Sequence, residues 1–134
     1  MRPLVMDASA CIDTLASPAT AARILAQHDV CAPTLLRWEV GNVVHGQQAA
    51  LFGDAKQRKA IVATLLRPMR LVDQAGREDA IADVARRHAL TFYDAAYLQL
   101  ALDEDAGLVT QDKALLQAAA KALGDDRALR LNSV

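Results

Sequence analysis

Short apolar runs alternate along this chain with longer stretches at helical spacing, and this alternation constrains the fold more than any other feature. The runs typical of brief, buried strands are residues 4–6, 30–32, 70–72, 108–109 and 129–131. The Ala- and Leu-rich stretches predicted to be helices are residues 19–27, 35–47, 55–66, 78–88, 93–103 and 114–123. Strands that alternate with helices favour a mainly parallel sheet covered on both faces.

Length and charge limit the domain count and the kind of partner. A chain of 134 residues is near the commonest size of one domain, and 53% hydrophobic residues are ample for a core. We therefore expect a single domain over residues 1–134. The 15 Lys and Arg residues against 16 Asp and Glu give a net charge of -1. Because there is no global basic field, nucleic-acid binding would need a local basic patch.

Targeting and redox signals indicate a cytoplasmic protein. No apolar run reaches the length of a membrane span, and Asp7 comes too early for a secretory signal. Cys11 and Cys31 have no Cys or His neighbour at zinc spacing, and a domain with this apolar content needs no disulfide. We expect both thiols to be reduced and buried.

Four carboxylates stand where ligand chemistry is expected in such a fold. Asp7 follows the first apolar run directly and Asp112 lies just beyond residues 108–109, so both should project over the carboxyl edge of the sheet. Glu39 shares a helix face with Asn42, and Asp94 lies near a helix start. Several acids brought together remain ionised only if a positive charge neutralises them. The pattern predicts a divalent metal site.

Each acid also has a structural interpretation. Asp7 and Asp112 could cap the helices that follow them, and Thr91 with Asp94 resembles a capping box. Glu39 could be a surface acid paired with an arginine, either Arg37 or Arg23. The shared apolar context of all four acids favours the functional interpretation over separate structural roles.

The ordered motifs resemble the PIN-domain ribonucleases, and most closely the VapC-type toxins. The resemblance rests on Asp7-Ala8-Ser9, Glu39-Val40-Gly41-Asn42-Val43-Val44, Tyr93-Asp94-Ala95-Ala96-Tyr97-Leu98-Gln99-Leu100-Ala101 and Leu108-Val109-Thr110-Gln111-Asp112. It implies a three-layer α/β/α sandwich with a short, mainly parallel sheet, and four acids around Mg²⁺ or Mn²⁺. Ser9, Asn42 and Thr110 would be polar supports, and Thr110 would contact substrate or water. Lys113 follows Asp112 where some members carry another acid.

The activity that the resemblance implies is metal-dependent hydrolysis of RNA, leaving a 5′-phosphate and a 3′-hydroxyl. Hard cations on carboxylates activate water and relieve phosphoryl charge. Asp7 and Asp94 are the expected direct ligands, while Asp112 and Glu39 would ligate, hold waters or help to deprotonate the nucleophile. The resemblance further implies a type II toxin, a cognate antitoxin that covers the site, and a homodimer.

Contacts to RNA phosphates require a local basic surface. The candidates are Arg37, Lys56, Arg58, Lys59 and Lys113, with solvated helix charge as the alternative interpretation. Trp38, beside Glu39, is interpreted as a packing or interface residue because single-strand binders generally show several exposed rings.

Two other functional classes fit the same pattern. The first is a doubly wound phosphoacceptor domain, which would normally carry paired acids at the first strand, whereas Asp7 has none adjacent. The second is a catalytically silent protein-binding module whose acids only cap helices.

Overall fold

The computed structural model describes residues 1–134 and contains one five-stranded sheet with the order β3-β2-β1-β4-β5. The strands are β1 (Arg2–Met6), β2 (His28–Pro33), β3 (Arg70–Val72), β4 (Gly107–Val109) and β5 (Ala128–Leu129). Every neighbouring pair is parallel, and Leu4 of β1 lies opposite Val30 of β2 and Gly107 of β4. The parallel sheet predicted from the alternating pattern is confirmed.

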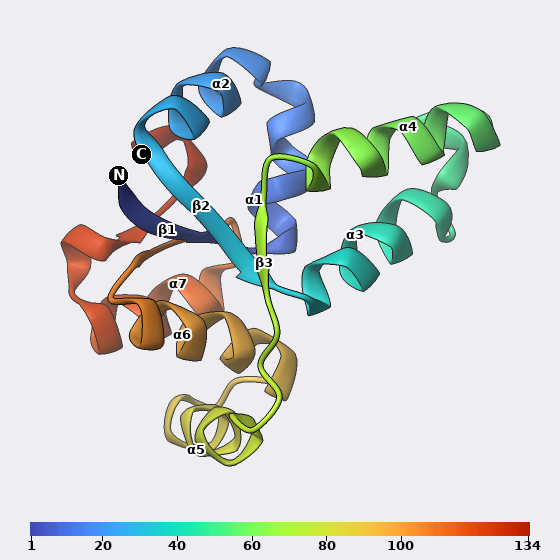
Figure 1. Ribbon diagram of the computed structural model, residues 1–134. Coiled ribbons are helices and arrows are strands. Elements are labelled where there is room, and N and C mark those ends of the chain that lie inside the picture. The colour runs from blue at the N-terminus through green and yellow to red at the C-terminus, as the bar shows by residue number, and fades with distance from the viewer.

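Seven α-helices connect and cover the strands (Figure 1). They are α1 (Ala8–Asp13), α2 (Pro18–Gln27), α3 (Leu35–His45), α4 (Ala55–Leu66), α5 (Glu78–His88), α6 (Phe92–Glu104) and α7 (Lys113–Leu123). Because parallel crossovers are right-handed, α1 to α4 belong to one face of the sheet and α5 to α7 to the other. The α/β/α sandwich is confirmed. No helix is both long enough and apolar enough to cross a bilayer.

The core lies between the central strands and α6. Leu4, Val5 and Met6 of β1 are buried, and α6 is buried continuously from Ala95 to Ala101. A helix that is apolar on all sides must lie inside the fold. The α5 helix therefore packs on the outer side of α6, as Figure 1 shows. Both cysteines are free and buried, as predicted.

Three element boundaries differ from the sequence expectations. The strand predicted at 129–131 is present but comprises Ala128–Leu129, and Leu131–Ser133 form a 3-10 turn. The buried position of Leu131 comes from side-chain packing, while its backbone N–H bonds to the side chain of Gln111. The α3 helix ends at His45, two residues early, because the chain turns away at Gly46. The short α1 helix was expected only in the interpretation of Asp7 as a helix cap, and it begins where the Asp7 side chain accepts from the N–H of Ala10.

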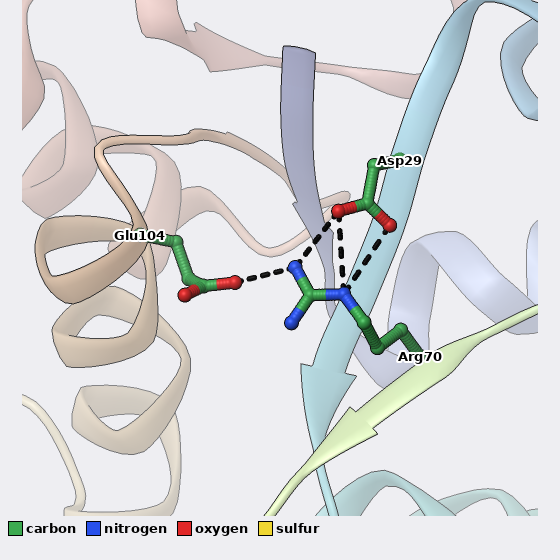
Figure 2. Close-up of polar contacts among 3 residues, drawn as sticks. All are labelled: Asp29, Arg70 and Glu104. Carbon is green, nitrogen blue, oxygen red and sulfur yellow. Dashed lines mark hydrogen bonds and ion pairs between the residues drawn. The ribbon is translucent and has the colours of Figure 1, made fainter. Parts of the chain in front are cut away.

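An ion network joins the outer strand to the helical layer (Figure 2). Arg70, the first residue of β3, bonds to both carboxylate oxygens of Asp29 on β2 and to Glu104 at the end of α6. The Arg70–Asp29 distance is 2.9 Å, and this bonding lowers the pKa of Asp29. The network lies at the opposite end of α6 from Asp94.

Candidate active site

The site forms at the carboxyl ends of the two central strands. After β2 and β3 have been added on one side of β1, the chain returns to place β4 on the other side. At such a switch point the loops diverge and leave room for a ligand. The Asp7 N–H donates to Val109 O at 3.1 Å, so the residues that follow β1 and β4 lie side by side.

Asp7 occupies the centre of this edge and is only 5% exposed. Its Oδ1 accepts from Ser9 Oγ at 2.7 Å and from the Ala10 N–H at 2.9 Å. Its Oδ2 accepts from the hydroxyl of Thr110. Burial raises the pKa of the Asp7 carboxyl, and the charge of Asp112 raises it further, while these hydrogen bonds offset part of the shift.

Ser9 and Thr110 hold the two loops together. The N–H of Gln111 donates to Ser9 Oγ at 2.9 Å, and the N–H of Asp112 donates to Thr110 Oγ1 at 3.0 Å. Thr110 is completely buried. Both hydroxyls therefore bridge the loop after β1 and the loop after β4.

Asp94 and Glu39 approach the same site from the helices. Burial raises the pKa of Asp94 on the first turn of α6, and the charges of Asp112, Asp7 and Glu39 raise it further, in that order. The four carboxylates, which we call the acidic group, therefore lie within electrostatic range of one another. Asn42 of α3 lines the same surface pocket as Glu39.

Tyr97 is a site residue to which the sequence analysis assigned no role. It is 1% exposed, and its hydroxyl donates to Glu39 Oε1 at 2.5 Å. Its burial and the bond to Glu39 raise the pKa of the phenol, so it stays a donor at neutral pH. The available signal was its spacing of three residues from Asp94, which places both on one face of a helix. Gln111 was also missed, and its side chain accepts from the N–H of Leu131 at 3.0 Å.

The acidic group has no cationic partner within the protein. Some acids elsewhere in the chain are paired: Asp29 and Glu104 with Arg70 (Figure 2), and Asp103 with Arg77 at 2.8 Å. None of the four site acids belongs to an ion pair, so the expected alternative of Glu39 with Arg37 or Arg23 is wrong. Arg23 instead donates to the carbonyl of Val134 at 2.7 Å.

A hard divalent cation fits this donor set, because carboxylate and hydroxyl oxygens without a countercharge are its preferred surroundings. The structure contains no group of three or more acidic, histidine or cysteine side chains already arranged around one ion position. The four carboxylates therefore lie near one another but do not form a complete coordination sphere.

Two of the acids also cap helices. Asp7 caps α1, and Asp112 Oδ2 accepts from the Leu115 N–H at 2.8 Å at the start of α7. The α6 helix is capped by Thr91 Oγ1, which accepts from the Asp94 N–H at 3.0 Å. The side chain of Asp94 is not the cap, so capping does not explain why this acid is here.

The predicted basic residues separate into different surroundings. Arg37 and Lys59 line one cleft between α3 and α4. Lys113 begins α7 beside Asp112, and Lys56 is exposed on α4. Arg58 instead donates to the carbonyl of Gly53 at 2.7 Å, which ties it to the start of its own helix.

Trp38 is 70% exposed, so the packing interpretation is wrong. It borders a surface pocket of about 430 Å³ together with Glu39, Val43 and Tyr93. An exposed indole beside an acidic site is typical of a contact surface.

Comparisons with known proteins agree with the fold. The PIN domain family model matches residues 4–121. The chain is also similar to a crystal structure of PAE2754 from Pyrobaculum aerophilum, with a TM-score of 0.76 and 24% identity over 98% of this chain and 85% of that one. No curated protein matches. PIN domains are generally nucleases, and this chain belongs to the PIN domain family.

Proposed function

We propose that this protein is a Mg²⁺- or Mn²⁺-dependent endoribonuclease and the toxin of a type II toxin–antitoxin pair. The observation that supports the nuclease activity is the acidic group: burial and the neighbouring acids raise the pKa of Asp94 and of Asp7, and none of the four carboxylates has an arginine or lysine partner. Such a group is stable in the ionised form only with a bound cation.

In this proposal each side chain has a defined task. Asp7 and Asp94 would hold the cation, which when bound activates water and relieves the charge of the phosphoryl oxygens. Asp112 and Glu39 would orient waters or accept the proton of the attacking water. Tyr97 holds Glu39 in place, and the bonds of Ser9 and Thr110 keep Asp7 directed toward the site.

Cleavage of single-stranded RNA tests the activity. We expect cleavage with Mn²⁺ and none with a chelator, and a rate at least about 100-fold lower for Asp94→Asn. Asp105→Asn is the matched control, because Asp105 is a solvent-exposed acid just after the same helix and asparagine tolerates its left-handed backbone. If wild type neither cuts RNA nor gains thermal stability from Mn²⁺, the proposal is wrong and a silent binding module is favoured.

The toxin part of the proposal has a separate test. The acidic group offers a basic side chain of an antitoxin a place to bind and thereby block the site. Expression of the wild-type chain alone should arrest growth of the host, whereas Asp94→Asn should not. Growth without arrest, combined with RNA cleavage in vitro, would indicate a housekeeping nuclease in the cytoplasm.

The proposed homodimer would form through an exposed apolar patch beside the site. The patch comprises Trp38 and Val43 of α3 and Phe92 and Tyr93 of α6, and all four side chains are exposed. Monomers rarely leave such side chains together without a partner surface. Sedimentation should give a dimer for wild type and a monomer for Trp38→Ala, and an unchanged mass would refute this interface.

A further inference from the structure

A basic cleft separates α3 from α4, on the side of α3 away from Glu39. Its volume is about 590 Å³, and Leu66 and Leu71 form part of an apolar floor. Arg37 and Glu39 are two residues apart on α3 and so point about 200° away from each other around the helix. One helix thus has Glu39 of the acidic group on one side and this cleft on the other.

Four basic side chains line the cleft, in an order set by the two helices. Arg37 and His45 are eight residues apart on α3, and Lys59 and Arg67 are eight apart along α4. Eight residues make about two turns, or about 12 Å, so each pair lies on one face of its helix. Since α3 leaves the sheet and α4 returns to it (Figure 1), Arg37 and Arg67 lie toward the ends of the two helices nearer the sheet, and His45 and Lys59 lie farther from it.

The arginine and lysine side chains of the cleft have no countercharge. No Asp or Glu lines the cleft. Arg37, Lys59 and Arg67 take part in none of the ion pairs of the protein. In a chain with a net charge of -1, three unpaired cations around one cavity are a local concentration of positive charge.

We infer that the α3–α4 cleft binds phosphate groups of the RNA backbone and holds the substrate on the far side of α3 from the acidic group. This inference rests on the proposed function. An acidic site repels a polyanion, so affinity for RNA must come from cations placed outside it. Two guanidinium groups at one end of the cleft match the oxygens of a phosphate, and the second basic pair about 12 Å away along the helix axes suits a later phosphate of the same strand.

Binding is measured with a chelator present, so that cleavage plays no part. The probe is a fluorescent 12-nucleotide single-stranded RNA, titrated at several salt concentrations against wild type and the Lys59→Gln/Arg67→Gln double variant. Loss of two phosphate contacts should weaken binding about tenfold or more and reduce the slope of log K against log salt by about 1.4. Lys121→Gln on α7, exposed and in no ion pair, is the charge-matched control and should bind like wild type.

Two further titrations distinguish the sources of the anion. A hexaglutamate peptide represents an acidic protein segment, and inorganic phosphate represents a free small anion. The inference is overturned if the double variant binds RNA with wild-type affinity and slope, or if it loses affinity only for the peptide or only for phosphate. Unchanged melting temperatures show that the variants are folded. If the protein binds RNA through the cleft but does not cleave it, the nuclease proposal is wrong and this inference stands. If the protein cleaves RNA and the double variant binds RNA like wild type, the nuclease proposal stands and this inference is wrong.

Discussion

Replacement of Tyr97 by phenylalanine tests whether Glu39 is held in place from inside the core. Tyr97 is 1% exposed, and its ring is enclosed by the core around α6. Phenylalanine keeps the ring and removes only the hydroxyl, which donates to Glu39 Oε1 at 2.5 Å. The substitution therefore deletes one hydrogen bond and leaves the carbon packing unchanged.

The size of the effect follows from the surroundings of the two groups. A hydrogen bond to a charged partner contributes about 1.5–3 kcal/mol to stability. The cost of deleting the donor is smallest where water can take its place at the acceptor. Glu39 is half-buried and borders a surface pocket, so water can replace the lost donor. We expect a loss of about 1.5 kcal/mol in the free energy of unfolding, equivalent to about 5 °C in the melting temperature of a domain of this size.

Activity should fall together with stability, through kcat more than through KM. A Glu39 side chain that is free to move orients water poorly, and small misplacements of catalytic groups are costly, so we expect about a tenfold lower kcat. Thermal melts in chelator and cleavage kinetics with Mn²⁺ give the two values.

Tyr93→Phe is the matched control. Tyr93 lies on the same helix, is 60% exposed and has no hydrogen-bond partner for its hydroxyl within the protein. It should match wild type in both measurements. The reasoning is refuted if Tyr97→Phe melts and cleaves like wild type, or if the control loses as much.

Two more predictions concern charge. The raised pKa of Asp7 means that the metal-free folded state binds its proton more tightly than the unfolded state. The free energy of unfolding therefore falls as the pH rises above 3.8, the ordinary pKa of an aspartate side chain. Over that pH range, melts in chelator should show a smaller loss of stability for Asp7→Asn than for wild type. An equal or steeper decline for Asp7→Asn would contradict this. Arg70→Met should cost only about 0.5–1 kcal/mol, because the Arg70 and Asp29 side chains are 45% and 40% exposed, and 1 M salt should remove most of the difference in urea unfolding.

The parts of the fold that the sequence predicted well are those set by local patterns. Periodicity placed β1 and α6, because burial on one face or on all sides requires apolar residues at regular spacing. The end of the chain was predicted less well, since Leu131 is buried through a turn and not through a strand. A buried apolar residue is compatible with a strand or with a turn, so the sequence pattern does not distinguish the two.

The candidate site shows the same division. Asp7 and Asp112 were predicted together because parallel strands end at one edge of a sheet, whichever residues they contain. The bond from Tyr97 to Glu39 joins residues 58 positions apart, and no local pattern reports it. The exposure of Trp38 was likewise undetermined, since an indole next to an acid occurs in cores and on surfaces alike.

The sequence by itself determined the class of fold and the acids that follow its strands, because hydrophobic periodicity and strand direction are properties of neighbouring residues. Only the tertiary structure decided which acids have no countercharge and which cations gather between α3 and α4. Charges interact through space, and the distances between them are set by the packing of helices that the chain order does not reveal.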